Sequence, residues 1–461
     1  MFKADTYIQR RKKLKEKIKS GVLFFLGNEE SPMNYPSNPF GFRQDSTFLY
    51  YWGLDFPGLA AIIDVDQEEE VIFGCDYTVD DIIWMGPQKT MIEKARQIGV
   101  KQTQPPESLE GKIKEALQKN RVIHFLSQYR PENIIHISKL TGIPNALVNE
   151  SASTELVKAV VAQRSIKSNE EVEQIEAALD ISYEMNKVAM KLSKPGIYER
   201  EVYGAIEGLV LSAGSHVSFP VIFSIHGETL HGHSHENLMK EGDILVLDSG
   251  AESPLHYASD ITRTFPVSGK FTGIQKDVYN IVLSAQEKAI EMMAPKVPYK
   301  EVHIQVARII ADGMRQLGFM KGNTEDAVFA GAHALFFPHG LGHMMGLDVH
   351  DMENMGEDYV GYDEETERSD QFGLAYLRLA RKLQPGFVVT VEPGIYFIPE
   401  LIDQWKAENK HTDFIDYEKI EANKGFGGIR IEDDVLVTED GHRVLGKSIA
   451  KTVEEVEAWC S

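Results

Sequence analysis

Cysteine, long apolar runs and excess positive charge are all scarce in this sequence, and each shortage excludes a class of protein. Only Cys75 and Cys460 are cysteines among 461 residues, so no disulfide framework is expected to hold the fold. No stretch approaches the roughly 20 apolar residues of a membrane-spanning helix. Lysine and arginine number 48 against 70 aspartates and glutamates, a net charge of −22. Nucleic acids and anionic membranes are therefore not expected as partners, because both are bound by basic patches.

The sequence is long enough for two domains, and its apolar share of 43% is enough for sizeable cores. We predict one domain over 1–165 and a second over 166–461. Near the N-terminus the basic cluster 10–13 precedes the short apolar run 22–26. This pattern lacks the long apolar segment and cleavage site of a secretory signal. It predicts a solvated helix leading into a strand, and a cytoplasmic location.

The first domain has the pattern of an α/β fold. Apolar runs predict strands and helical periodicity predicts helices between them. The predicted strands are 22–26, 60–65, 71–73 and 122–126, and the predicted helices lie around 112–117 and 131–140. The dense aromatic stretch 42–52 is interpreted as core and interdomain packing, since aromatic side chains are mostly buried.

The second domain begins with a pair of predicted helices and repeats that pattern later. Ser168 and Glu171 form a capping box, and apolar residues then recur at helical spacing up to Pro195. Further helices are predicted over 198–213, 275–293 and 299–317. Each pair precedes strand-like segments, which hints at a duplicated unit. The acidic stretch 356–368 and the polar stretch 403–424 are predicted to be surface insertions.

Two aspartates stand at the ends of adjacent predicted strands. Asp248 closes the apolar run 244–247, and Asp260 precedes a second alternating run beyond the break at Ser253-Pro254. Buried carboxylates side by side cannot both stay ionised unless a positive charge lies between them. The alternative is a pair of turn-capping aspartates.

Three later segments carry similar chemistry. In PHGLGHMMGLDVHD, residues 338–351, the glycines between His339 and His343 disfavour a helix and predict a loop that presents imidazoles. Glu392 ends an apolar strand and is followed by Pro393-Gly394. In GGIRIEDDVLV, residues 427–437, period-two alternation puts Arg430 and Glu432 on one face. A surface hairpin with salt bridges is the alternative for this last segment.

Taken together, these segments supply a candidate ligand set for divalent ions. The set consists of Asp248, Asp260, His343, Glu392 and Glu432. Four carboxylates balance the charge of two divalent ions, and oxygen-rich ligation with a single imidazole favours Mn²⁺, with Zn²⁺ and Co²⁺ as alternatives. Such an ion pair would activate water and polarise a carbonyl group.

The sequence resembles the proline-specific metallopeptidases of the pita-bread fold family, which include prolidase and Xaa-Pro aminopeptidase. The motifs that carry the resemblance are DSGAE…YASDITRTFP, HGLGHMMGLDVHD, VEPGIYF and GGIRIEDDV. The likeness extends over residues 165–461, and the segments FRQDSTFLYYWGL and Trp84-Met85-Gly86 resemble the family's smaller N-terminal domain. The resemblance implies an α/β (α+β) protein: a creatinase- and prolidase-type α/β domain followed by a catalytic domain of duplicated helix pairs and antiparallel sheet. It also implies a homodimer.

Roles for individual residues are implied by the resemblance. It assigns the five residues above as ligands of two metal ions, with Asp260 and Glu432 bridging, and makes Glu392 the proton shuttle as well. His231 matches a substrate-side histidine, His350 the one that steadies the tetrahedral intermediate, and His339 and Arg430 match other pocket positions. His231, His233 and His235 occupy alternate positions along the chain. The polar sequence around them predicts histidines in a solvated loop. A strand that binds another metal ion through these three side chains is the alternative.

The spacer before Glu392 bears on substrate choice within the family. Arg378 resembles the arginine that holds the carboxylate of a dipeptide substrate in eukaryotic prolidase, a task suited to a guanidinium fork. Its alternative is the basic end of a helix with Arg381 and Lys382. We therefore expect an Xaa-Pro dipeptidase. An Xaa-Pro aminopeptidase acting on longer peptides is the second hypothesis, and an inactive peptide-binding module is the third.

Overall fold

The computed structural model describes residues 1–461, and the chain divides into two compact units. The first unit consists of 1–164 together with 354–359, and the second of 165–353 together with 360–461. No helix combines the length and apolar character needed to cross a membrane.

The first unit is a mixed sheet with helices around it. Its strands are β1 (Val22–Leu26), β2 (Ala60–Asp64), β3 (Glu69–Phe73), β4 (Gln102–Gln104) and β5 (Ile123–His124). They lie in the order β4-β3-β2-β1-β5, in which the two outer pairs are parallel and the inner pairs antiparallel. The helices are α1 (Ala4–Lys17), α2 (Ser46–Trp52), α3 (Val79–Met85), α4 (Met91–Arg96), α5 (Ser108–Gln118), α6 (Pro131–Thr141) and α7 (Thr154–Arg164).

The predicted strands and helices of this unit are confirmed, although the predicted strand 122–126 is shorter. Residues 46–52 of the aromatic stretch form α2, a short helix in which every residue is buried. The solvated-helix prediction for 10–13 is wrong for two residues, because Arg10 is 6% and Arg11 is 0% exposed. Arg11 donates to the carbonyl oxygens of Tyr51 and Ile98 and pairs with Glu70, so its charge is satisfied inside the unit.

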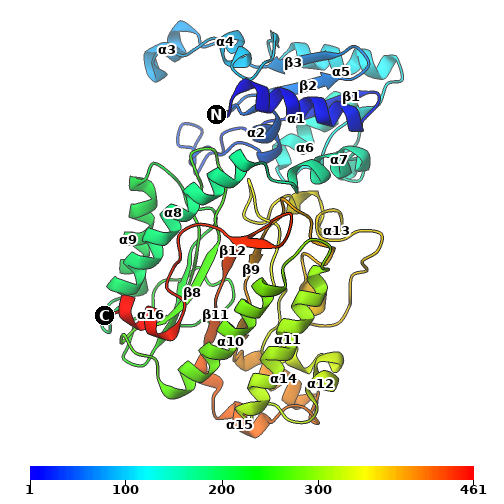
Figure 1. Cartoon of the computed structure of the whole chain (residues 1–461). Helices are drawn as coiled ribbons and strands as arrows, with labels where there is room; N and C mark the ends of the chain where they lie inside the picture. The colour runs from blue at the N-terminus through cyan, green and yellow to red at the C-terminus, as the bar shows by residue number, and fades with distance from the viewer. The chain divides into compact units, whose positions relative to one another are not determined.

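The second unit carries two helix pairs, each followed by strands. Its helices are α8 (Asn169–Leu192), α9 (Glu199–Ser212), α10 (Gly273–Met292), α11 (Tyr299–Gln316), α12 (Thr324–Ala330), α14 (Pro399–Ala407), α15 (Tyr417–Glu421) and α16 (Val453–Trp459). The short helix α13 (Glu357–Val360) ends where the chain re-enters this unit. Within the unit, α8 packs beside α9 and α10 beside α11 (Figure 1). The capping box of Ser168 and Glu171 at the start of α8 is confirmed.

Three small antiparallel sheets lie among these helices. The strands are β6 (Ile222–Ser224), β7 (Ile244–Ser249), β8 (Ile261–Pro266), β9 (Val388–Val391), β10 (Gly394–Tyr396), β11 (Gly428–Arg430), β12 (Asp433–Val437) and β13 (His442–Val444). They pair as β6-β7-β8, β13-β12-β9 and β10-β11. The hairpin alternative for 427–437 is wrong, because β11 pairs with β10 whereas β12 pairs with β9 and β13. The residues between the two strands, Ile431 and Glu432, are buried rather than on the surface.

The acidic stretch 356–368, predicted to be a surface insertion, differs in part from that prediction. Most of 363–370 is exposed, but Val360, Gly361 and Tyr362 are buried. Tyr362 packs with Leu377 and Ala380 in a small apolar cluster. An apolar side chain inside an acidic run is buried when a neighbouring segment offers an apolar surface.

Candidate metal centre

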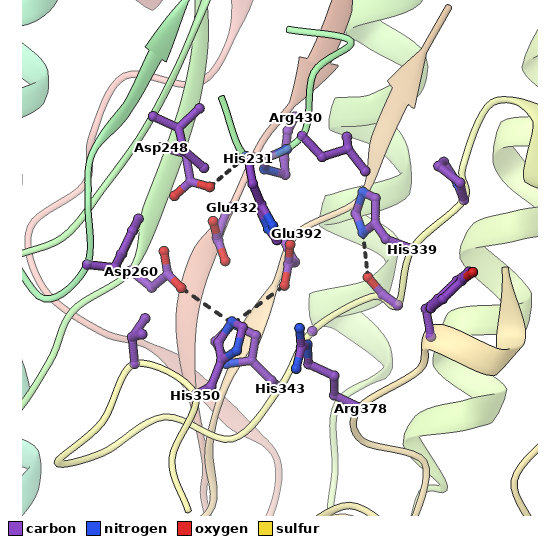
Figure 2. Close-up of a pocket in the computed structure, with 18 of the residues that line it drawn as sticks. His231, Asp248, Asp260, His339, His343, His350, Arg378, Glu392, Arg430 and Glu432 are labelled. Carbon is purple, nitrogen blue, oxygen red and sulfur yellow. Dashed lines mark hydrogen bonds and ion pairs between the residues drawn. The ribbon is translucent and has the colours of Figure 1, made fainter. Parts of the chain in front are cut away.

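A cavity of about 700 Å³ opens in the second unit. All ten residues predicted as site residues line it: His231, Asp248, Asp260, His339, His343, His350, Arg378, Glu392, Arg430 and Glu432. Figure 2 shows their side chains converging from segments that are far apart in the sequence. The capping alternative for the two aspartates is wrong, since Asp248 lies within β7 and Asp260 immediately before β8, each on the cavity wall.

The antiparallel pairing of β7 and β8 brings the two aspartates to the same region of the sheet. Asp248 pairs in register with Thr262, which lies two residues beyond Asp260. Side chains two apart on a strand share a face, so Asp260 and Thr262 both point toward the cavity side. The peptide N–H of Asp260 donates to Asp434 Oδ2 at 3.1 Å, which holds the start of β8 in place.

His343 is held by the strand that carries Glu392. Its peptide N–H donates to Thr390 Oγ1 at 3.0 Å, and the peptide N–H of Thr390 donates to the carbonyl oxygen of His343 at 3.0 Å. Thr390 Oγ1 lies 3.4 Å from Glu392 Oε1. The predicted loop around Gly340 and Gly342 is confirmed, and the glycine at 342 is required there because a Cβ would lie 2.1 Å from the carbonyl oxygen of Thr390.

Acidic and imidazole groups that line the cavity lie close to one another, and three of them, Asp260, His343 and Glu432, are buried. Ligand atoms of Asp260, His343 and Glu432 all lie within 4.8 Å of one another. His343 Nε2 is 3.4 Å from Asp260 Oδ2 and 3.6 Å from Glu392 Oε1 (Figure 2). Asp248 lies beside this group and pairs with Arg430 at 2.6 Å through Oδ2.

Burial sets the protonation of these groups when no cation is present. Burial, and after it the charges of Glu432 and Asp248, hold the pKa of Asp260 well above its usual value. Burial and the neighbouring Glu392 and Asp248 do the same to the pKa of Glu432. Burial raises the pKa of Glu392 to about 7 against the opposing charge of Arg430. Burial, with His350 next, lowers the pKa of His343 well below its usual value, so this imidazole is neutral.

The donor set fits a divalent metal ion. The Nδ1 atom of His343 lies 3.1 Å from the carbonyl oxygen of Met344, a contact that leaves the Nε2 lone pair facing the carboxylates. Buried Oδ1 atoms of both Asp248 and Asp260 have no hydrogen-bond partner. Unpaired buried carboxylate oxygens and an imidazole lone pair that face one another repel, and a cation among them removes that cost.

A second network connects Asp248 to His339 on the opposite wall. Arg430 donates to Asp248, to Thr262 Oγ1 at 3.1 Å and to the Tyr396 hydroxyl at 2.8 Å. The Tyr396 hydroxyl also lies 2.9 Å from His339 Nε2. Thr262 Oγ1 in turn donates to Glu432 Oε2 at 2.6 Å. Arg430 is therefore a fixed positive charge beside the carboxylates.

The remaining predicted residues lie around the open part of the cavity. The ring of His350 lies 4.1 Å from that of His343, centre to centre. The helix-end alternative for Arg378 is wrong, because the helical turn at Leu374–Tyr376 ends before it and Arg378 faces the cavity. His231 and His233 line the cavity from a loop, whereas His235 stacks on Tyr203 at 4.1 Å, so no metal-binding strand forms there.

Several residues that support the site were not identified from the sequence. Thr262 and Thr390 each lie two residues from a predicted ligand, so the period of a strand could have indicated them. Tyr396 meets Arg430 and His339 only through the fold, as Glu353 meets Arg378, although Glu353 also lies three residues from His350 and contacts it locally. An apolar wall was missed as well, formed by Phe219, Ile222, Leu230, Phe372, Tyr376, Ile398 and Leu401.

The fold and the buried donor set define a metal-dependent hydrolase. Comparison with protein families shows that the chain belongs to the metallopeptidase family M24, whose model matches residues 173–439. The aminopeptidase P N-terminal domain matches residues 7–124. The resemblance inferred from the motifs is thereby confirmed.

Relatives of two kinds are similar over nearly the whole chain. Human Xaa-Pro dipeptidase is 34% identical over 452 residues, which cover 96% of this chain and 89% of that protein. A probable Xaa-Pro aminopeptidase of Metarhizium acridum is 30% identical over 445 residues, which cover 95% of this chain and 85% of that protein. Zinc-substituted Escherichia coli aminopeptidase P in complex with product is similar in structure, with a TM-score of 0.82 and 27% identity over 100% of this chain and 98% of that one. The predicted fold class, an α/β N-terminal domain followed by a pita-bread domain, is confirmed.

Proposed function

We propose that this protein is a peptidase with two divalent metal ions that hydrolyses the bond before proline, acting as an Xaa-Pro dipeptidase. The observation that carries the proposal is the convergence of the five predicted ligand side chains and Arg378 on one cavity. Family membership and the names of the relatives support the reaction class.

Asp248, Asp260, His343, Glu392 and Glu432 would hold the two ions, with Mn²⁺ proposed because the set is rich in oxygen and has a single imidazole. Divalent ions there would lower the pKa of water and draw electron density from the scissile carbonyl group. We also retain as proposals a homodimeric state and a cytoplasmic location.

Glu392 is proposed to move the proton during the reaction. Its Oε1 lies 3.4 Å from Thr390 Oγ1 and 3.6 Å from His343 Nε2, so the carboxyl group faces the centre of the proposed site. A carboxylate held beside the bound water is within reach of the proton that the water loses on attack. It takes a proton from the attacking water and delivers it to the proline nitrogen, which carries no hydrogen of its own.

The cavity walls offer positions for the two ends of a dipeptide. The apolar wall, with Phe219, Phe372 and Tyr376, would receive the proline ring by shape. Arg378 would pair with the carboxylate of that proline. His350 would donate from its Nε2 to the oxygen that becomes negative, because its Nδ1 is already bound to Glu353 at 2.5 Å. His231 and His339 would contact the substrate from other sides.

An Xaa-Pro aminopeptidase is the alternative function, favoured by the structural similarity to aminopeptidase P. The substrates of the two enzymes differ in the group on the C-terminal side of the proline. A dipeptide ends there in a carboxylate, whereas a longer peptide continues as an uncharged amide.

The proposal is tested by comparing hydrolysis of Ala-Pro and Ala-Pro-Ala with added Mn²⁺. We expect the native protein to prefer Ala-Pro, and Arg378→Ala to lose roughly 10- to 100-fold in kcat/KM on Ala-Pro alone, as expected for a charge-assisted hydrogen bond of about 1.5–3 kcal/mol. Arg443→Ala, which removes an exposed arginine paired with Glu176, is the matched control. Equal rates on both substrates would instead establish the aminopeptidase, and no turnover of either would refute the proposal.

A further inference from the structure

One carboxylate that does not line the cavity connects two side chains that do. Glu353 begins a single helical turn, Glu353–Met355, three residues after His350. Its Oε2 lies 2.5 Å from His350 Nδ1, and its Oε1 accepts a hydrogen bond from Arg378 Nη1. His350 and Arg378 both line the cavity, whereas Glu353 does not.

The contact with His350 fixes which ring nitrogen faces the cavity. A carboxylate that accepts from Nδ1–H holds the imidazole in one tautomer and one orientation. The hydrogen bond with His350 contributes most to lowering the pKa of Glu353, which falls to about 2. This carboxyl group is therefore ionised. Glu353 therefore presents a full negative charge behind the ring.

The contact with Arg378 places the same negative charge beside the guanidinium group. The backbone of this arginine is held from the other side, where a Cβ on Gly361 would lie 1.7 Å from the Arg378 carbonyl oxygen. Tyr362 also donates through its hydroxyl to the carbonyl oxygen of Leu377 at 2.6 Å. The backbone at Arg378 is therefore packed on one side, and on the cavity side the guanidinium group lies against Glu353, where a substrate carboxylate would also approach it.

We infer that Glu353 is a positioning residue that sets the selectivity of the site for substrates with a free carboxylate, by partly neutralising Arg378 while it holds His350 in place. The inference rests on the proposed function. A carboxylate bound at Arg378 is repelled by Glu353, because both anions approach one guanidinium group. The chain thus limits how tightly it binds ligands with a free carboxylate, including the proline that the reaction releases.

Two substrates that differ only in that carboxylate separate the two effects of Glu353. Ala-Pro and Ala-Pro amide contain the same scissile bond. In Glu353→Gln, which keeps the size of the side chain, we expect the KM for Ala-Pro to fall roughly three- to tenfold because the repulsion is gone. The KM for Ala-Pro amide should stay unchanged. The kcat should fall roughly tenfold on both substrates, as when a partner that orients a functional imidazole is lost.

The control and the double variant identify the route of the effect. Glu364→Gln removes the same charge from an exposed position outside the cavity and should leave all four constants unchanged. In Glu353→Gln combined with Arg378→Ala, the effect on the KM for Ala-Pro should vanish, because that effect passes through Arg378.

The outcomes distinguish this inference from the proposed function. A lower KM confined to Ala-Pro and dependent on Arg378 supports the inference. If Glu353→Gln changes the KM of both substrates alike, or of neither, Glu353 has no part in selectivity and the inference is wrong, while hydrolysis by the native protein still upholds the proposed function. If the native protein hydrolyses neither substrate, the proposed function itself fails.

Discussion

At Gly342 the backbones of two segments that carry predicted ligands pack closely, because glycine has no side chain. A methyl group added there should force the two segments apart. In Gly342→Ala the new Cβ would lie 2.1 Å from the carbonyl oxygen of Thr390 and 2.7 Å from the Tyr299 hydroxyl oxygen. Ordinary contact begins at 3.4 Å, so relief requires a movement of about 3.4 − 2.1 = 1.3 Å. The obstructing carbonyl group belongs to the backbone of β9 and cannot rotate away.

The size of the effect depends on the contacts that such a movement breaks. Both hydrogen bonds between His343 and Thr390 cross the same gap, so His343 would shift relative to Glu392. A displacement of about 1 Å at a reacting centre costs roughly 100-fold in rate. Overpacking of this kind also costs about 1–3 kcal/mol of stability. We therefore expect weakened metal binding and activity in a protein that still folds.

The assays are Mn²⁺ titration, thermal unfolding with and without Mn²⁺, and hydrolysis of Ala-Pro. Gly204→Ala is the matched control, because nothing lies within 4 Å of a Cβ at that position in α9. The control should keep its activity and gain about 0.5–1 kcal/mol of stability from the better helix residue. Native metal affinity and native turnover in Gly342→Ala would refute the role given to this close contact.

Three further predictions concern the surroundings of the site. Lys167 and Asp351 form an ion pair at 2.9 Å with side chains only 1% exposed. Lys167→Met leaves the Asp351 charge buried and unpaired, so the free energy of unfolding measured in denaturant should fall by about 3–5 kcal/mol. A loss under about 1 kcal/mol would contradict this. Burial raises the pKa of Glu392 to about 7, above the value near 4.3 of an unfolded chain, so its contribution to stability is complete below about pH 4.3 and is lost as pH rises through 7. The gap in melting temperature between Mn²⁺-loaded and metal-free protein should thus widen from about pH 5 to 8, and a constant gap would exclude this carboxyl group as the cause. Tyr396→Phe leaves a donor of Arg430 and a ring nitrogen of His339 without their shared partner, so thermal unfolding should show a loss of about 1–3 kcal/mol, and unchanged unfolding would count against the network.

The ends of the strands that carry the ligands could be predicted from local patterns. Alternation and apolar runs located β7, β8 and β9, and with them Asp248, Asp260 and Glu392. The glycines beside His343 correctly excluded a helix. These inferences succeeded because side-chain period and glycine content are properties of a few neighbouring residues.

Other features could not be read from the sequence because they depend on contacts between distant segments. Arg11 belongs to a basic run on a helix, and only the contacts with Glu70 and two backbone carbonyl groups offset the cost of its burial. The apolar packing of Tyr362 depends on Leu377. Glu353 looks like one more acid in an acidic region until the fold places Arg378 against it.

The close approach of Gly361 to the backbone of Arg378 has a consequence for how such proteins diverge. The segment around Gly361 lies outside the cavity, yet it packs against the backbone that carries Arg378 into the cavity. Insertions or deletions in the exposed residues 363–370 that come next can therefore alter which peptides are accepted while the hydrolytic machinery is inherited unchanged. One scaffold can in this way yield descendants with different substrate ranges from mutations at its periphery.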